Sequence, residues 1–401
     1  MACRICNSFT EEVLNLGLTP PANSLLDSSL AVQQTFPLVL ELCESCYNVQ
    51  LRDCLSSEEL YLKYLYITPE STMLTRHYRY LYGYLESSGY IKKESFVVEV
   101  GSNVGLFLKF IRNKVSRVVG IDPAENICKI ANEAGVDTIC DFFNSESALI
   151  IRDQYGVPDI IIARHCFAHN SNPHVLMKGV TTLLSDSGYL VIENSYLLNT
   201  IENNEFDQVY HEHMFYYSIR SMMALLNIHG LRLIDVMTSL IHGGSIVFVA
   251  KRENDGIIIN PSVNEYLECE QMFINRQSLK NFADKAYEIR GQIGKLIKNL
   301  RNTGKTIYTY GATAKGNTLL NFVGLTCNEI PLCIDSTPGK QGKYLPQSYI
   351  KVIPEDEGLL NPPDYFLLTA WNYRDEIINK VREAGNYHSK FIIPIPFVHI
   401  V

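Results

Sequence analysis

The stretch SFVVEVGSNVGLFLKFI, residues 95–111, decides the fold of this chain of 401 residues. Its residues 96–100 form a short apolar run rich in β-branched side chains, which predicts a strand buried on both faces of a sheet. Gly101 and Gly105 follow, and helical spacing of apolar residues begins at Leu106. Two glycines four apart let the backbone turn tightly and leave room for a ligand against the main chain. We therefore expect a strand–turn–helix unit with a ligand at its turn.

An acidic residue ends the next strand. The stretch RVVGIDPAENICKIA repeats the strand-to-helix pattern, and Asp122 stands where a carboxylate accepts hydrogen bonds from ribose hydroxyls. The spacing E-x-G-x-x-x-G differs from the G-x-G-x-x-G of dinucleotide folds, and it favours S-adenosylmethionine, which has no pyrophosphate. The residues expected to bind this cofactor are Glu99, Gly101, Asn103, Gly105 and Asp122.

Two further apolar runs extend the series. They are PDIIIARHCFAHN (158–170) and GYLVIENSYL (188–197), and both read as strands. The chain is therefore predicted to be an α/β protein with a parallel Rossmann-like sheet and its ligand at the carboxyl ends of the strands. His169 lies just past the first of these strands, where it faces the pocket unless it is a solvated loop histidine.

Composition narrows the class of protein. A content of 46% hydrophobic and 19% charged residues is typical of a globular chain, and the length predicts two or three domains. The formal net charge of −8, without a basic stripe, argues against nucleic acid as a partner. No apolar run reaches the roughly 18 residues of a membrane span, and the N-terminus lacks a signal-peptide layout. We expect a cytoplasmic monomer that binds neither nucleic acid nor membrane.

Four of the eleven cysteines form two Cys-x-x-Cys pairs, Cys3 with Cys6 and Cys43 with Cys46. Each pair turns sharply enough to aim two thiolates at one point, and four thiolates give the tetrahedral coordination that Zn²⁺ accepts. The alternative is two free or redox-active dithiols. Because about sixty residues make a small core, a structural zinc would supply the missing stability.

The stretch FDQVYHEHMFYY, residues 206–217, gathers Tyr210, His211, Glu212 and His213. A zinc-protease site is not expected, because the H-E-x-x-H pattern is absent. Capping of backbone groups by the imidazoles stays open as a structural alternative. Proton transfer is the better interpretation, since a histidine flanked by a carboxylate can be held in one tautomer and its imidazolium stabilised.

The last third of the chain predicts a long connecting helix that starts near residue 265, ends at Gly304 and allows for one break, and then a second strand–turn–helix unit, TIYTYGATAKGNTLLNF (306–322). The pattern of this unit resembles that of a dinucleotide-binding site, so an NAD-dependent oxidoreductase is an alternative function. Its glycines do not follow G-x-G-x-x-G. Amides at the helix N-terminus together with Lys315 can instead take the diphosphate of a nucleotide-sugar.

The order of these motifs resembles one family. It comprises the cysteine pairs, TPPANSLL (19–26), VVEVGSN (97–103), CFAHN (166–170), NEFDQVYHEHMFYYS (204–218), HGGS (242–245) and YGATAKGNTLL (310–320). The chain is similar to nucleotide-sugar C-methyltransferases, which methylate a ring carbon of thymidine-diphosphate-linked keto-deoxysugars. The resemblance implies a zinc domain at 1–60, a central methyltransferase domain at 61–250 that binds S-adenosylmethionine, and a C-terminal α/β domain at 251–401.

The resemblance also implies residue roles. His213 is the expected base that removes a proton beside the ketone, while Tyr210 and Glu212 orient the sugar or its enolate. His169 matches a pocket histidine of the family across the same site. Tyr66 and His211 are expected to contact the substrate.

Two residues depart from the family pattern. Val104 stands where an acidic residue is expected, and an asparagine is expected near Arg164. A methyltransferase acting on an acceptor other than a sugar stays an alternative. A zinc-bearing scaffold without catalytic activity would explain the cysteines alone.

Overall fold

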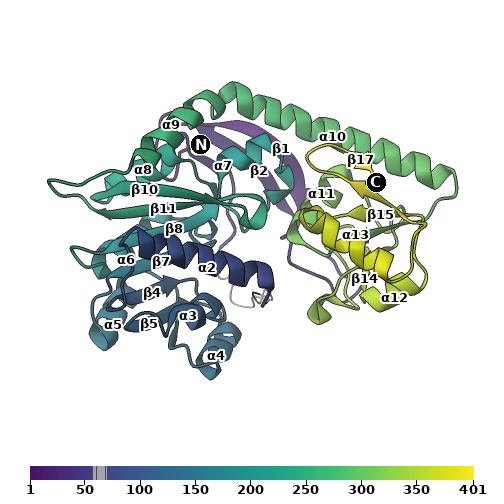
Figure 1. Ribbon diagram of the computed structural model, residues 1–401. Helices are drawn as coiled ribbons and strands as arrows, with labels where there is room; N and C mark the ends of the chain where they lie inside the picture. The colour runs from purple at the N-terminus through teal and green to yellow at the C-terminus, as the bar shows by residue number, and fades with distance from the viewer. Residues whose placement is uncertain (57–59, 61–67, 69) are drawn as a thin grey trace.

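A computed structural model describes residues 1–56, 60, 68 and 70–401 of the chain (Figure 1). Tyr66, expected to contact the substrate, lies outside the described residues. The described chain builds three β-sheets of four, seven and six strands. None of its helices combines the length and apolar character that crossing a membrane requires.

The first sheet carries the cysteine pairs and is antiparallel. Its order is β1 (Thr10–Thr19), β2 (Phe36–Cys43), β3 (Val49–Leu51) and β9 (Phe215–Tyr216). The first three strands come from the N-terminal region. The fourth comes from the segment just after His213, so this sheet and the histidine-rich segment form one structure.

The second sheet has seven strands in the order β10-β11-β8-β7-β4-β5-β6. Their bounds are β4 (Phe96–Val100), β5 (Arg117–Asp122), β6 (Thr138–Cys140), β7 (Ile160–Arg164), β8 (Tyr189–Ser195), β10 (Leu231–Ser239) and β11 (Ser245–Arg252). The five strands β4 to β8 are parallel, as the sequence predicts. The antiparallel pair β10–β11 extends the sheet beyond that prediction.

Helices cover both faces of this sheet, which explains why every residue of β4 is buried. Val97 packs with the cluster that includes α2 (Thr72–Ser87) and α3 (Leu106–Ile111). Val98 and Val100 point to the opposite face, which is covered by α5 (Ser145–Tyr155), α6 (Pro173–Leu183) and α8 (Ile219–Ile228). The remaining elements of this region are α4 (Glu125–Glu133), η1 (Phe167–His169), α7 (Leu197–Glu202), η2 (Phe206–Gln208) and η3 (Ile241–Gly243).

Two helices lead to the third sheet, α9 (Pro261–Phe273) and the 27-residue α10 (Arg276–Asn302). The break between them is a capping box in which the side chain of Asn275 accepts a hydrogen bond from the amide of Ser278. In Figure 1, α10 runs along the N-terminal strands to the C-terminal unit, and the Tyr287 hydroxyl donates to the carbonyl of Asn15 over 2.9 Å. The helix therefore ties the two ends of the molecule together.

The third sheet has the order β14-β13-β12-β15-β16-β17, parallel except for β17. Its elements are β12 (Ile307–Tyr310), α11 (Ala314–Val323), β13 (Leu332–Ile334), η4 (Pro338–Lys340), β14 (Lys351–Ile353), α12 (Glu355–Leu360), β15 (Tyr365–Leu368), η5 (Trp371–Tyr373), α13 (Arg374–Glu383), β16 (Lys390–Ile393) and β17 (His399–Ile400). The expected second strand–turn–helix unit is present as β12, its glycine turn and α11.

Candidate active site

A cavity of about 790 Å³ lies between the central and C-terminal units. It is lined by the glycine turn after β4, the end of β5, the histidine-rich segment and the first turn of α11. The predicted site residues that line it are Gly101, Asn103, Asp122, His169, Tyr210, Glu212, His213 and Lys315. Of the residues predicted to act in catalysis or to bind the cofactor or the substrate, Glu99, Gly105 and His211 lie in the described part of the chain but do not line the cavity.

The glycine turn is held open by backbone geometry. Gly101 has φ +64°, and a Cβ atom there would lie 2.5 Å from Cβ of Cys166, so only glycine fits. Gly105 has φ +71° and caps α3, where it packs against Val136. Gly101 thus keeps main chain accessible at the cavity, whereas Gly105 shapes the turn from behind.

Asp122 stands beside this turn at the end of β5. Its carboxylate accepts hydrogen bonds from the backbone amides of Asn103 (3.0 Å) and Ala124 (3.1 Å). Burial raises the pKa of Asp122, and these two amides oppose that rise. A carboxylate next to accessible main chain fits the ribose and methionine parts of S-adenosylmethionine.

Glu99 lies behind the cavity wall as the partner of Arg164. The Nε and Nη2 atoms of Arg164 each lie 2.8 Å from Oε1 of Glu99. The guanidinium also lies 4.8 Å from the ring centre of Tyr78 and 4.5 Å from that of Phe107. A buried cation needs such a carboxylate and such rings. Arg164 itself lines the cavity, so Glu99 acts on the site through it.

A second buried carboxylate, Glu193 on β8, holds two histidines. The ring nitrogen Nε2 of His77 lies 2.8 Å from it and that of His165 lies 3.8 Å away. Burial raises the pKa of Glu193, but the two histidines and Arg164 outweigh it and bring the pKa to about 2. His77 and His165 line the cavity, and sequence reasoning missed His77. The sequence signal for His165 is the pair of polar residues, Arg164 and His165, at the end of an apolar strand.

His213 is fixed in one tautomer. Its Nδ1 lies 3.0 Å from the carbonyl oxygen of Gln208, which can only accept, so Nδ1 carries the proton. Its Nε2 therefore accepts a hydrogen bond from the Tyr210 hydroxyl over 2.7 Å. The ring stacks on that of His169, with centres 5.2 Å apart. Burial, and then His169, lowers the pKa of His213 far below its ordinary value, so the ring is neutral at neutral pH.

The pKa of Glu212 is shifted in the opposite direction to that of His213. Burial raises its pKa to about 7, although the Nδ2 of Asn23 donates to both carboxylate oxygens over 2.7 and 2.9 Å. Burial lowers the pKa of His169 to about 4. Neighbouring acids and bases with pKa values pushed apart are what proton transfer needs. Asn23 was missed as a site residue, although it lies in the TPPANSLL motif.

His211 points away from these groups. Its ring is buried and meets the ring of Phe36 edge-on, with centres 6.0 Å apart. The structure therefore places it against the first sheet, in contrast to the expected contact with the substrate.

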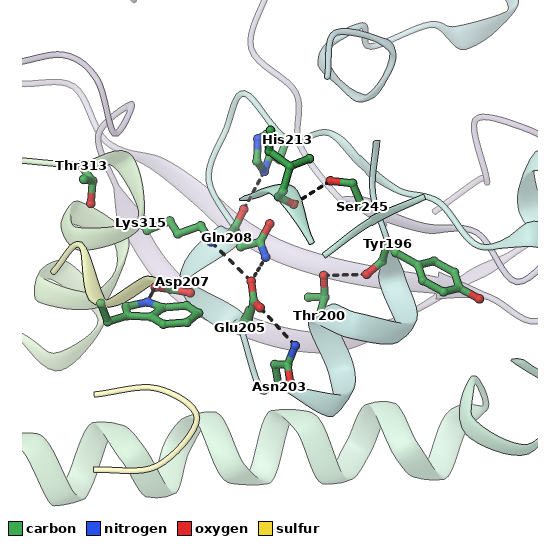
Figure 2. A network of polar contacts seen from close by, with 12 residues as sticks. Tyr196, Thr200, Asn203, Glu205, Asp207, Gln208, His213, Ser245, Thr313 and Lys315 are labelled. Atoms are coloured by element: carbon green, nitrogen blue, oxygen red, sulfur yellow. Dashed lines mark hydrogen bonds and ion pairs between the residues drawn. The ribbon is translucent and has the colours of Figure 1, made fainter. Parts of the chain in front are cut away.

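Lys315 reaches from the first turn of α11 toward the central unit. Its Nζ lies 3.4 Å from Oε2 of Glu205 and 5.1 Å from the ring centre of Trp371 (Figure 2). Burial raises the pKa of Glu205 to about 7, and Lys315 opposes the rise. The indole nitrogen of Trp371 donates to Oδ2 of Asp207 over 2.6 Å. The lysine therefore has carboxylates around it.

The four cysteines of the two Cys-x-x-Cys pairs lie together in a cluster that can hold a metal ion. Their Sγ atoms all lie within 4.8 Å of one another, with Cys3 to Cys46 at 3.6 Å and Cys6 to Cys43 at 3.4 Å. Tetrahedral Zn–S bonds of about 2.3 Å place sulfurs about 3.8 Å apart, whereas a disulfide needs about 2.05 Å. The cluster therefore fits a structural zinc ion with no open coordination position.

Three protein-family models match the chain. They are a zinc binding domain at residues 3–61, a methyltransferase domain at 74–236 and a C-methyltransferase C-terminal domain at 240–396. Over 100% of its length the chain is 36% identical to the C-methyltransferase NovU of Streptomyces niveus, of which it covers 96%.

Two solved methyltransferase structures resemble the chain over less than half of its length. Magnesium protoporphyrin IX methyltransferase from Synechocystis, solved with bound SAH, aligns with 46% of this chain and 90% of its own, at 12% identity and a TM-score of 0.35. A SAM-dependent methyltransferase from Anabaena variabilis aligns with 44% of this chain and 84% of its own, at 16% identity and a TM-score of 0.35.

Proposed function

Because the chain belongs to the C-methyltransferase family, whose members carry a zinc domain and use S-adenosylmethionine, we propose that its acceptor is a nucleotide-linked keto-deoxysugar. The nucleotide is expected to be thymidine diphosphate, and the methyl group goes to a ring carbon beside the ketone. Because the chain belongs to this family, the two alternative functions, an NAD-dependent oxidoreductase and a zinc-bearing scaffold without catalytic activity, are not supported.

The continuous cavity carries this proposal. It runs from Asp122 past His213 to Lys315, so cofactor, reacting carbon and nucleotide can lie along one path. Its volume of about 790 Å³ lies within the range of roughly 300–1,000 Å³ common for small-molecule sites. A cavity serving S-adenosylmethionine alone would not need the C-terminal unit.

The proposed reaction begins with proton abstraction. His213 takes the proton of the carbon beside the ketone at Nε2, and the electrons of the broken C–H bond form an enolate. Tyr210, which donates to that Nε2 in the present structure, turns its hydroxyl to the enolate oxygen. Glu212, with its pKa of about 7, can hold a proton and donate a hydrogen bond to the sugar. S-adenosylmethionine, when bound, supplies an electrophilic methyl group for the enolate carbon.

The diphosphate is proposed to lie at the N-terminus of α11. Lys315 and the first amides of this helix line the cavity there and favour an anion. Glu205 competes with the diphosphate for Lys315, and its pKa of about 7 lets it take up a proton when an anion arrives. Lys315→Ala should weaken thymidine-diphosphate binding at least tenfold, measured by calorimetry. Unchanged affinity would remove Lys315 from this role.

The reaction is tested with His213→Asn in deuterated water. Thymidine-diphosphate 4-keto-deoxysugars, enzyme and S-adenosylmethionine are incubated together and analysed by mass spectrometry. The wild-type enzyme should add one methyl group and exchange the proton beside the ketone, and His213→Asn should lose both by at least a hundredfold. S-adenosylhomocysteine should bind the variant with unchanged affinity, because His213 is not at the glycine turn.

The matched control is His229→Asn. His229 is also a paired histidine, 2.8 Å from His174, but it does not line the cavity. Its substitution should change turnover less than twofold. If His213→Asn keeps exchange at the wild-type rate, another group is the base. If no keto-sugar of the panel is exchanged or methylated although S-adenosylhomocysteine binds, the acceptor is not of this class.

A further inference from the structure

We infer that helix α11 of the C-terminal unit positions the catalytic residues of the central unit, through the side chains of Asn317 and Thr318. The inference rests on the proposed function, in which His213 is the base and Glu212 orients the sugar. It gives a role to the stretch KGNTLL, which the proposed chemistry uses only at its lysine.

The first contact reaches the segment that carries His213. Oγ1 of Thr318 donates to the carbonyl oxygen of Val209 over 3.0 Å. Val209 is the link between Gln208, whose carbonyl fixes the tautomer of His213, and Tyr210, whose hydroxyl meets Nε2 of that ring. A shift at Val209 therefore moves both groups that orient the base.

The second contact reaches the segment that orients Glu212. Nδ2 of Asn317 donates to the carbonyl oxygen of Ala22 over 2.6 Å. The next residue, Asn23, holds both carboxylate oxygens of Glu212. Neighbouring residues on a helix point about 100° apart, so two adjacent side chains can hold two segments that are distant in sequence. Asn317 holds the segment that contains Ala22, and Thr318 holds the segment that contains Val209.

A third contact also connects α11 to His213. Lys315 pairs with Oε2 of Glu205, and that oxygen accepts a hydrogen bond from the side-chain amide of Gln208 (Figure 2). The Gln208 carbonyl in turn accepts from Nδ1 of His213. Figure 2 shows these four side chains in sequence from α11 to the base.

The helix that makes these contacts is rigidly placed. Asn317 is 1% and Thr318 is 3% exposed, so their hydrogen bonds are shielded from water. A Cβ atom on Gly316 would lie 2.6 Å from Cβ of Thr369, which shows how closely the helix approaches β15 and its following residues. Because a buried carbonyl that loses its donor costs about 1–3 kcal/mol, the segments would shift to find water or another donor. Small displacements of a base strongly reduce proton abstraction.

The test compares Thr318→Val with Thr318→Ser. Valine has nearly the shape of threonine but cannot donate to Val209, whereas serine keeps the hydroxyl. The rate of deuterium exchange beside the ketone, kcat, the KM for S-adenosylmethionine and its pH profile are measured, with the melting temperature. T318V should lower exchange and kcat together about tenfold, leave the KM for S-adenosylmethionine within twofold, and shift the pH profile of kcat. T318S should stay within twofold of the wild-type enzyme throughout.

A second variant, at another residue of α11, tests the inference independently in case Thr318→Val impairs folding. Asn317→Leu removes the donor to Ala22 and should lower kcat about tenfold through Glu212, again without changing the KM for S-adenosylmethionine. If the wild-type enzyme exchanges the proton and both variants exchange it at the same rate, whatever their melting temperatures, α11 only packs and the inference is overturned. If the wild-type enzyme exchanges no keto-sugar, the proposed function itself fails, and the inference with it.

Discussion

The two glycine turns of the molecule share one frame and differ in use. Each follows the first strand of a parallel sheet, and each has an aspartate at the end of the neighbouring strand that accepts from a turn amide. Asp122 accepts from Asn103 over 3.0 Å, and Asp335 accepts from Ala312 over 2.7 Å. The local sequence pattern therefore fixes the turn and the acid in both units.

The side chains beyond that frame decide what each turn does. At the second turn, Lys340 donates to the Ala312 carbonyl over 2.8 Å and lies 3.9 Å from Asp335, while Lys315 pairs with Glu205. The polar groups there are engaged with the protein. At the first turn no lysine pairs with Asp122 in the described residues, and the main chain is accessible at Gly101. A strand–glycine–helix pattern thus predicts a turn but does not assign it a ligand.

Alanine at each turn would break this comparison most directly. Gly101→Ala should lower the affinity for S-adenosylhomocysteine at least a thousandfold, because its Cβ meets Cys166 and its φ is +64°. Gly311→Ala meets Ala370 at 2.6 Å with φ +106°, so it should lower the melting temperature and leave that affinity within twofold. Calorimetry and thermal unfolding measure both. Equal loss of affinity would mean that the second turn also holds the cofactor.

The stability of the protein should depend on pH through Glu205, which pairs with Lys315 next to the second turn. Its folded pKa of about 7 lies above the ordinary value of about 4.3, so the folded state holds the extra proton between these pH values. The contribution of Glu205 to stability is therefore full below about pH 4.3 and is lost as the pH rises toward about 7, amounting to about 3 kcal/mol. Glu205→Gln removes it.

The measurement is the free energy of unfolding of the wild-type enzyme minus that of Glu205→Gln, from denaturant titrations at several pH values. This difference should fall between about pH 4.5 and 7 and stay flat above. A difference independent of pH would show that Glu205 is ionised throughout and that Lys315 dominates its surroundings.

The acids of the two turns sharpen the comparison further. Asp122→Asn should weaken S-adenosylhomocysteine binding about ten- to a hundredfold, since a hydrogen bond to a charged group contributes about 1.5–3 kcal/mol. Asp335→Asn should leave this affinity unchanged and lower only the melting temperature, because its carboxylate holds the amides of Ala312 and Thr337. Competition binding with labelled cofactor measures the pair under identical conditions.

The helix caps give the smallest expected effect. Thr313 caps α11 by accepting from the amide of Gly316 over 2.9 Å, whereas Gly105 at the start of α3 has no side chain for this purpose. Thr313→Ala should lower the free energy of unfolding by about 1 kcal/mol without changing cofactor affinity. Thr313→Ser keeps the oxygen and should be neutral. A loss of cofactor binding in Thr313→Ala would link the two turns.

Short-range patterns carried most of what the sequence could predict. The cysteine pairs, the strand of residues 96–100 and Asp122 each depend on neighbours within one or two elements, so spacing alone located them. The long helix and the second strand–turn–helix unit were predicted for the same reason. The structural zinc was predicted from the cysteine pairs, and the cofactor from the glycine turn and Asp122. The domain boundaries at residues 60 and 250 stay predictions.

Contacts between distant segments were not accessible in this way. Asn23 holds Glu212, Arg164 holds Glu99, and Thr318 holds the Val209 carbonyl, and nothing in the spacing of these residues indicates the pairing. His211 illustrates the converse: it adjoins Tyr210 and Glu212 in sequence but its ring turns to Phe36. Side-chain direction in an irregular segment depends on tertiary packing, which residue types alone do not specify.

The pairing of β9 with β3 has a consequence for biosynthesis. Val49 pairs with Tyr216, and the amide of Leu51 donates to the carbonyl of Met214, one residue after His213. A ribosome adding roughly 5–20 residues per second needs about ten to thirty seconds between these two segments. Until then the nascent zinc-bearing sheet has three strands and an unpaired edge. The arrival of the segment that contains His213 closes that edge when about half of the chain has been made, so the first sheet is complete before α11, which contacts the same segment, has been synthesised.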